Sequence, residues 1–269
     1  MASQNNLYVT QSGMAVNPIR AAFLKILGVD FIFKTFNVRA YQKLQDALVQ
    51  GVIGPDTKLM HFEVGGQSVT LLQIQMAYHH VAQGELKGEA WAAFLCVCCN
   101  MGTTVTPIIN EQIHHFRVTG IYNGMSIMSD DESQSVWEHI TGECIKGPLQ
   151  GTRLETRPAQ YLTAAQVLET TPDALIAISK PSLVARVSHF LLLRHMLNSS
   201  GYMPGLFRLS MTKKDERLAE LELGLGVWID KHARFYPLRS INTSNNAILD
   251  TLNQQLILVY VTDSASGIS

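Results

Sequence analysis

Residues 56–74 read DTKLMHFEVGGQSVTLLQI, a stretch that predicts a β-hairpin. Residues 58–64 have the composition of a strand, Gly65-Gly66 is typical of a tight turn, and residues 67–71 match a return strand. A hairpin early in the chain indicates that the core is built on strands, with helices packed around them.

Short strand-like runs continue on the C-terminal side of this hairpin. They are separated by turns rich in Gly and Pro, and the expected strands lie at 90–98, at 103–109 and 113–118 as a pair, and at 125–128. Apolar residues at helical spacing predict short helices at 72–83 and 163–169 and longer helices at 17–50 and 182–197.

The opening hairpin has a counterpart near the C-terminus. Residues 215–238 read DERLAELELGLGVWIDKHARFYPL and repeat the order of acidic lead-in, strand, Gly-containing turn, strand and helix start. The apolar run at 256–261 then corresponds to 91–98 but lacks cysteines. Two unrelated hairpins are the alternative interpretation.

These patterns predict an α+β fold in which two related β-rich halves pack with flanking helices as a single compact unit. We divide the chain into an N-terminal helical segment, a β-rich core that carries the motifs, a helix with a connector, and a degenerate repeat of the opening hairpin region. Their boundaries are 1–55, 56–180, 181–214 and 215–269.

The composition narrows the class of partner. Of 269 residues, 46% are hydrophobic and 16% charged, and 21 Lys and Arg nearly balance 22 Asp and Glu. A net charge of −1 argues against nucleic-acid binding and favours a small-molecule partner.

No apolar run reaches the ~18 residues of a membrane span and no secretory signal is evident, so we expect a cytoplasmic protein without a membrane partner. The sequence gives no oligomeric state.

Three of the four cysteines, Cys96, Cys98 and Cys99, lie within four positions, and the fourth is Cys144. In a reducing compartment this clustering favours metal or redox chemistry over a structural disulfide. The C-x-x-C spacing of Cys96 and Cys99 lets two thiolates bind one ion at a turn, or form a reversible disulfide. The plainer alternative is a small apolar run, because free cysteine is often buried.

A metal ion needs further ligands, and histidine is the natural choice. The candidates are His79, His80, His114, His115 and His139. His79 is favoured because it lies on the helix expected directly before the cysteine strand. Two cysteines and one histidine suit one copper or zinc ion and leave a coordination position open, as in catalytic sites. For the other histidines, a polar surface residue is the alternative.

Five motifs occur in a fixed order along the chain. They are Tyr78-His79-His80, Cys96-Val97-Cys98-Cys99-Asn100, Thr119-Gly120-Ile121-Tyr122-Asn123, Asp130 followed by Ser135-Val136-Trp137, and Thr141-Gly142-Glu143 followed by Gly147-Pro148-Leu149-Gln150-Gly151. In this order the chain resembles the bacterial proteins grouped as domain of unknown function 3179. The resemblance covers about residues 56–180, with the hairpin repeat at 215–238. Val97 stands where those proteins have proline, and His80 where they have an acidic residue.

The resemblance implies that His79, Cys96 and Cys99 form the shared site, although a shared site does not define a reaction. We expect a metal-dependent enzyme, an oxidoreductase acting on a small molecule. His80, or one of His114 and His115, would be a fourth ligand or an acid–base group. Asp130 and Tyr122 would orient the substrate or a histidine. The alternatives are a non-catalytic copper- or zinc-binding or trafficking protein, and a C-x-x-C thiol redox protein.

Overall fold

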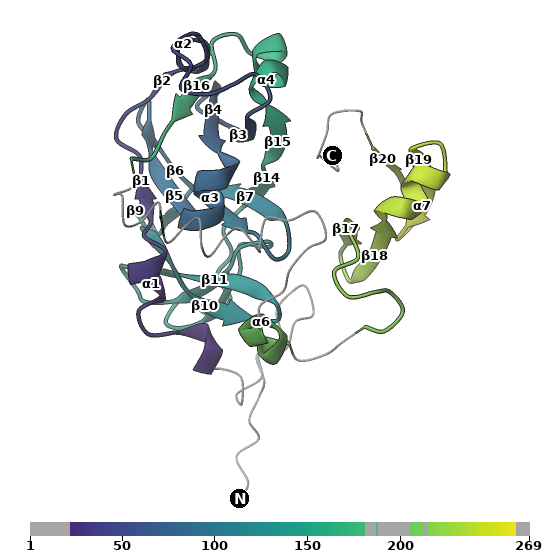
Figure 1. Ribbon diagram of the computed structural model, residues 1–269. Helices are drawn as coiled ribbons and strands as arrows, with labels where there is room; N and C mark the ends of the chain where they lie inside the picture. Colours follow the sequence, from purple (N-terminus) through teal and green to yellow (C-terminus); the bar gives the residue numbers. More distant parts are fainter. Residues whose placement is uncertain (1–21, 181–186, 188–204, 212–214, 262–269) are drawn as a thin grey trace, which may run out of the picture.

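A computed structural model of the chain describes residues 22–180, 187, 205–211 and 215–261. This part is built mostly from β-strands, which form several sheets with a few short helices (Figure 1). The expectation of a β-rich α+β protein is confirmed at this level. Within the described ranges, no helix is both long enough and apolar enough to span a bilayer.

Three sheets make up the main body. The central sheet contains, in spatial order, β1 (Phe36–Asn37), β5 (Val81–Leu86), β6 (Glu89–Cys96), β7 (Met101–Val105) and β14 (Thr156–Pro158). The hairpin sheet contains β15 (Gln160–Thr163), β3 (Lys58–Val64), β4 (Gln67–Leu72), β16 (Leu175–Ala177) and β2 (Gln42–Lys43). The meander sheet contains β10 (Phe116–Tyr122), β11 (Met125–Asp130), β12 (Val136–Glu138) and β13 (Cys144–Lys146).

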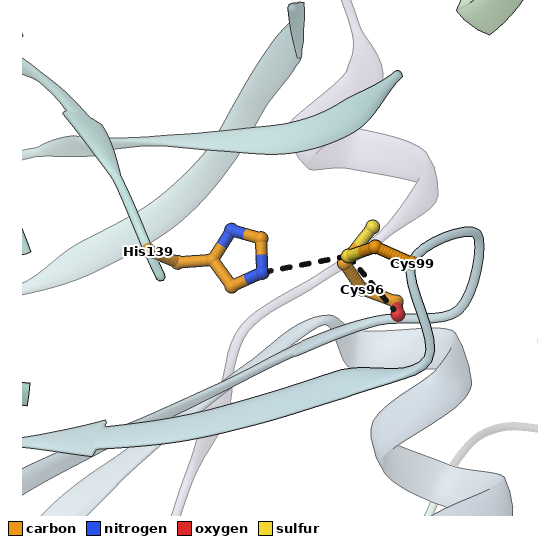
Figure 2. A group of neighbouring side chains, drawn as sticks. All are labelled: Cys96, Cys99 and His139. Atoms are coloured by element: carbon orange, nitrogen blue, oxygen red, sulfur yellow. Dashed lines mark hydrogen bonds between the residues drawn. The ribbon is translucent and has the colours of Figure 1, made fainter. Parts of the chain in front are cut away.

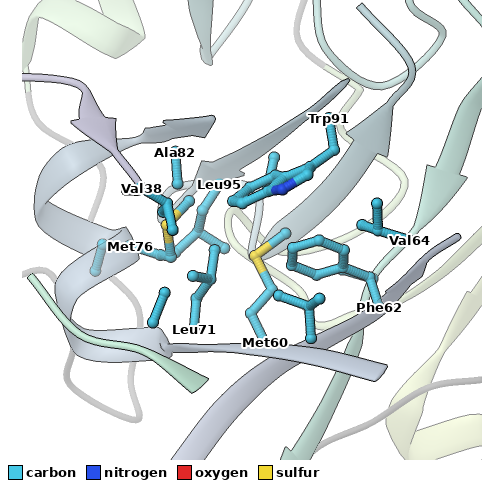
Figure 3. Close-up of a cluster of buried hydrophobic side chains, with 14 of the residues drawn as sticks. Val38, Met60, Phe62, Val64, Leu71, Met76, Ala82, Trp91 and Leu95 are labelled. Atoms are coloured by element: carbon cyan, nitrogen blue, oxygen red, sulfur yellow. The ribbon is translucent and has the colours of Figure 1, made fainter. Parts of the chain in front are cut away.

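The central sheet is covered on both faces, and β6 shows why. Along β6, Trp91, Ala93 and Leu95 pack into the cluster shared with the hairpin sheet (Figure 3). The alternate residues Ala92 and Phe94 pack into the cluster shared with the meander sheet. Successive strand residues point to opposite faces, so a strand buried on both sides is a continuous apolar run. The same alternation directs Cys96 toward the meander sheet.

Short helices pack against the edges of these three sheets. They are α1 (Val29–Ile32), α2 (Leu44–Val49), α3 (Gln73–His79), α4 (Ala164–Thr170) and α6 (Gly205–Ser210). Helices α2 and α4 share a buried cluster with the hairpin sheet through Leu44, Val167 and Leu59. Helix α3 joins β4 to β5 and packs Met76 and Ala77 into the cluster between the hairpin and central sheets.

The remaining described strands form separate two-stranded sheets. They are β8 (Ile108–Ile109) with β9 (Gln112–Ile113), β17 (Gly224–Ile229) with β18 (His232–Pro237), and β19 (Ala247–Leu252) with β20 (Gln255–Tyr260). Helix α7 (Leu238–Thr243) connects β18 to β19, and this C-terminal group lies beside the main body (Figure 1). It has a small apolar cluster of its own around Tyr236, Ile241 and Val259.

The helix expected at 17–50 is wrong over its described part. Residues 29–49 form α1, β1, β2 and α2 instead of one helix. The reason is packing, because Leu24, Val38 and Leu44 enter three different buried clusters. A single straight helix could not reach three separate clusters. The helix expected at 182–197 lies outside the described residues apart from Val187.

The first hairpin and the short helix after it were predicted more accurately than the N-terminal helix. The strands at 58–64 and 67–71 and the helix at 163–169 are confirmed as β3, β4 and α4. The expected helix at 72–83 ends at His79, and the chain enters β5 at Val81. The pairing of 103–109 with 113–118 is confirmed only where β8 meets β9, at Ile108 and Ile113. The longer strands of these segments pair elsewhere, β7 with β6 and β14, and β10 with β11.

Candidate metal centre

The turn between β6 and β7 brings two cysteines together. Cys96 is the last residue of β6 and pairs with Met101 across the hairpin, so four residues form the turn. Asn100 adopts a left-handed conformation with φ of 48°, which asparagine tolerates in turns. The turn returns Cys99 toward the strand end, where its Sγ lies 3.7 Å from the carbonyl oxygen of Cys96. Cys96 is fully buried, whereas Cys99 is partly exposed.

The loop after β12 supplies a histidine to the same place. Glu138 organises this loop, because its buried carboxylate accepts hydrogen bonds from the backbone N–H of Ile140 and from both the N–H and the hydroxyl of Thr141. The hydroxyl of Thr103 on β7 donates to the carbonyl oxygen of His139 over 2.7 Å. These contacts attach the His139 loop to the central sheet beside the cysteine turn.

His139 points its Nε2 atom at the cysteines (Figure 2). Nε2 lies 3.9 Å from Sγ of Cys99, and the ligand atoms of Cys96, Cys99 and His139 all lie within 4.8 Å of one another. In a tetrahedral zinc site, standard bond lengths place a sulfur and a nitrogen ligand about 3.6 Å apart. The three side chains therefore need only small adjustments to share one ion.

The imidazole of His139 is oriented as a metal-ligating histidine is. Its Nδ1 lies 3.1 Å from the carbonyl oxygen of Ser126, which can only accept a hydrogen bond. The proton therefore sits on Nδ1, and Nε2 presents its lone pair to the cysteines. Metal-bound histidines usually donate their second ring N–H in this way, which fixes the ring and raises the basicity of the ligand atom.

The environment also favours a thiolate at Cys96. Hydrogen bonds from the thiols of Cys98 and Cys99 lower the pKa of Cys96 well below its ordinary value, against the effect of burial. The backbone N–H of Ser126 approaches the Cys96 sulfur at 3.4 Å. The same hydrogen bonding to Cys96, together with burial, raises the pKa of Cys98 and of Cys99. One thiolate is thus held by two neighbouring thiols.

A hydroxyl group without a partner lies next to this cluster. Among the described residues, only Ser129 Oγ and Tyr161 Oη are buried side-chain atoms that lack a hydrogen-bond partner. Burial raises the pKa of Tyr161, and the charges of Cys99 and Cys96 raise it further, which places the phenol near both. The hydroxyl occupies the space above Gly102, where an added Cβ would lie 2.6 Å from it. A buried hydroxyl without a protein partner can bond to a water, an ion or a substrate group beside it.

Gly142 shapes the His139 loop, and we expect Gly142→Ala to lower the free energy of unfolding by about 2–4 kcal/mol. Its φ is +73°, and an added Cβ would lie 2.3 Å from the carbonyl oxygen of Leu154. Urea unfolding measures the loss. Gly88→Ala is the control, because Gly88 has a similar φ of +81° with open space around it and should lose only about 1–2 kcal/mol. Equal decreases in the free energy of unfolding of the two variants would show that the contact with Leu154 does not contribute to the effect.

His79 lies elsewhere than the sequence hypothesis placed it. Its Nδ1 contacts the carbonyl oxygen of Lys34 at 2.5 Å, and its Nε2 lies 2.8 Å from the hydroxyl of Ser179. Both ring nitrogens are thus engaged, and burial lowers the pKa of the imidazole. The structure brings Cys96 and Cys99 together, but it places His139 beside them rather than His79.

His80 lies close to the cluster. It is buried, with its Nδ1 2.9 Å from the carbonyl oxygen of Leu95, the residue before Cys96. Burial lowers its pKa, and its charge interactions are with Cys96 and His139. His80 also has a positive φ of 58° where α3 ends, a backbone strain that is often found at functional sites.

Of the other two predicted site residues, Asp130 lies apart from the cysteines and Tyr122 packs in an apolar cluster. Asp130 is at the far end of β11 from Ser126, four residues or about 13 Å along the strand. Tyr122 is fully buried among Leu24, Ile127 and other apolar side chains of the meander sheet. Cys144 is buried in the cluster between the central and meander sheets, where burial raises its pKa to about 11.

The sequence contained a signal for His139 that spacing did not reveal. His139 lies two positions before the motif Thr141-Gly142-Glu143, whose first two residues belong to the loop that carries it. It lies 40 positions after Cys99, on a different sheet. Only the packing of the meander sheet on the central sheet brings the two residues together.

One comparison with known proteins is informative. A family described as a protein of unknown function, DUF3179, matches residues 40–268. No curated protein and no solved structure matches the chain.

Proposed function

The chain belongs to the DUF3179 family, and from the cysteine–histidine geometry we propose that it is a metal-dependent enzyme, an oxidoreductase that acts on a small molecule. The observation that carries this proposal is the convergence of Cys96, Cys99 and His139, with the lone pair of His139 Nε2 aimed at the sulfurs. His139 takes the role that sequence reasoning gave to His79.

The donor set favours one copper or zinc ion. Soft thiolates select copper(I) and zinc, and imidazole suits both metals. When bound, copper would supply one-electron or oxygen chemistry, and zinc would polarise a substrate oxygen. Three protein ligands leave a tetrahedral ion with one position for a substrate or water.

The surroundings of the cluster supply groups for a substrate at that position. Cys99 is partly exposed, so the cluster is accessible from solvent. The hydroxyl of Tyr161 can donate a hydrogen bond to a group held beside Cys96 and Cys99. Because Nδ1 of His80 donates to Leu95, its Nε2 carries a lone pair and can accept a proton. Tyr161 is a substrate-positioning group in this proposal, and His80 is an acid–base group.

A second candidate function rests on the three neighbouring thiols. Cys96 accepts hydrogen bonds from both Cys98 and Cys99, so a disulfide within the turn is a chemical alternative to metal binding. Thiol counting distinguishes the two. A thiol redox protein gains two titratable thiols per chain on mild reduction, whereas a resident metal site gains none.

The experiment for the main proposal combines metal retention with turnover. The protein is loaded with copper(I), passed through gel filtration and challenged with a copper chelator, and oxygen consumption is followed with ascorbate as the electron donor. We expect the parent to retain copper and consume oxygen, and His139→Gln treated identically to do neither. His79→Gln is the matched control and should behave as the parent does. Copper that is retained without oxygen consumption would favour simple binding, and copper lost readily to the chelator would favour trafficking.

Tyr161→Phe is expected to separate stability from metal binding. Without metal, the variant should unfold within about 0.5 kcal/mol of the parent, because the hydroxyl it removes has no partner. Zinc affinity should fall roughly tenfold, the value of one hydrogen bond to the group at the open position. Isothermal titration with zinc measures this change. Unchanged zinc affinity together with a large loss of stability would assign Tyr161 a structural role.

We also propose that the C-terminal strands are a degenerate repeat of the first hairpins. The order of strand, strand, helix, strand, strand occurs both at 58–96 and at 224–260, which supports a common origin. The second segment has histidine at His232 but no cysteine, so the proposed site belongs to the first segment alone.

A further inference from the structure

A second group of polar side chains lies at the other end of β11. His114 is 6% exposed, and its Nδ1 lies 3.0 Å from Oδ1 of Asp130, which is fully buried. The neighbouring His115 is exposed and pairs through its Nδ1 with Oε1 of Glu132 at 2.7 Å. This group is about 13 Å along the strand from the cysteine cluster and is independent of it.

Asp130 is held by its own loop and by Trp137. Oδ1 accepts from the backbone N–H of Ser133, and Oδ2 accepts from the Ser133 hydroxyl, the N–H of Ser135 and the indole N–H of Trp137. Burial opposes ionisation, but these hydrogen bonds and the one from His114 lower the pKa of Asp130 below its ordinary value. Asp130 is therefore a fixed carboxylate.

A fixed carboxylate determines which nitrogen of His114 carries the proton. Nδ1 must donate to Asp130, so Nε2 of the neutral ring is an acceptor. Among the described residues, Nε2 has no hydrogen-bond partner. Both oxygens of Asp130 are already satisfied by several donors, so a metal ion would have to displace them. The arrangement fits a proton-accepting pair better than a metal site.

His114 also lines a pocket. A cavity of about 310 Å³ is lined by His114 and His115, by Asn37 and Arg39, and by Gln83 and Trp91. Its walls come from the segment after β1, the β5–β6 hairpin and the segment before β10, which are far apart in the sequence. Gln83 fixes these walls to one another, donating to Asn37 Oδ1 and accepting from the N–H of Phe116.

The polar groups of the pocket indicate the chemistry of its ligand. Arg39 is exposed and has no ion pair among the described residues, so its guanidinium is available to a carboxylate. Glu85 also lines the pocket and disfavours a ligand with more than one negative charge. Nε2 of His114 offers an acceptor to a hydroxyl group. The volume is at the lower end for ligand sites, which restricts the ligand to a small molecule.

We propose that this pocket binds a small organic acid that carries a hydroxyl group, with the carboxylate on Arg39 and the hydroxyl on Nε2 of His114. Asp130 positions His114 and fixes its tautomer. The site is additional to the proposed metal centre and does not depend on it.

The test uses 3-hydroxybenzoate as the probe, with benzoate as the matched acid that lacks the hydroxyl group. Isothermal titration on the full chain should show 3-hydroxybenzoate binding more tightly than benzoate. Arg39→Gln should weaken both acids by roughly tenfold, and His114→Gln should weaken 3-hydroxybenzoate by a similar factor while leaving benzoate unchanged. Arg157→Gln and His61→Gln are the controls and should bind as the parent does.

Two results would overturn the proposal. One is a parent protein that binds 3-hydroxybenzoate no better than benzoate, or neither acid. The other is 3-hydroxybenzoate binding that survives Arg39→Gln. Arg39 is exposed and without an ion pair among the described residues, so this variant tests the site even if His114→Gln disturbs the fold.

Discussion

The double variant Cys96→Ser, Cys99→Ser is expected to lower zinc affinity by more than a hundredfold. In metal sites, removing a hydrogen-bond partner that only orients a ligating side chain already lowers the metal affinity roughly 10–100-fold. Here two of three ligands are lost, and a serine hydroxyl does not replace a thiolate as a soft, charged donor at neutral pH. Cys96 is the more readily ionised of the two thiols, because hydrogen bonds from Cys98 and Cys99 lower its pKa.

Thermal unfolding with and without zinc measures this effect. A ligand that binds only the folded state stabilises it by about 4 kcal/mol when its concentration is a thousand times the dissociation constant. The parent should show this increase, and the double variant should not. Cys144→Ser is the matched control, since Cys144 is a buried thiol outside the cluster. An equal zinc response in the parent and the double variant would contradict the assignment.

Asp130→Asn is expected to lower the free energy of unfolding by about 3–5 kcal/mol at pH 7. The carboxylate is fully buried and accepts hydrogen bonds from Ser133, Ser135, Trp137 and His114. An amide in its place has only one acceptor oxygen, and its NH2 group would face donors. Zinc binding should be unchanged, because the cysteine cluster lies about 13 Å away along β11.

The pH dependence provides a second readout of Asp130. Its pKa is lower in the folded state than in the unfolded chain, so it stabilises the fold fully above the unfolded value of about 3.9. That contribution is lost as the pH falls through the folded pKa. Urea unfolding of the parent and Asp130→Asn should therefore differ most at pH 7 and converge in acid.

Asp131→Asn is the control for both measurements. Asp131 is about half exposed and pairs with Arg117 at the surface, so its loss should cost about 1 kcal/mol or less. A difference between the parent and Asp130→Asn that stayed constant down to pH 3 would show that the ionisation of Asp130 does not stabilise the fold.

The strands around the cysteines were predictable because their signals are local. The Gly65-Gly66 turn fixes the first hairpin, and the apolar run ending at Cys96 follows from burial on both faces. The convergence of Cys96 and Cys99 was predictable for the same reason, since both lie at one hairpin turn.

The histidine partner and the N-terminal segment depend on tertiary packing. His79 is near Cys96 in the sequence, but the α3–β5 connection directs its ring to Lys34 and Ser179. His139 reaches Cys99 only because the meander sheet packs against the central sheet. Helical spacing in the N-terminal segment was equally misleading, because its apolar residues enter separate clusters.

The most direct test of the metal centre is the metal content of protein purified without a metal-affinity tag. Elemental analysis of the parent, His139→Gln and His79→Gln in parallel separates the two histidines as ligands. We expect about one copper or zinc ion per chain in the parent and in His79→Gln, and a clear loss in His139→Gln. Equal metal content in His139→Gln and the parent would contradict a centre built from Cys96, Cys99 and His139.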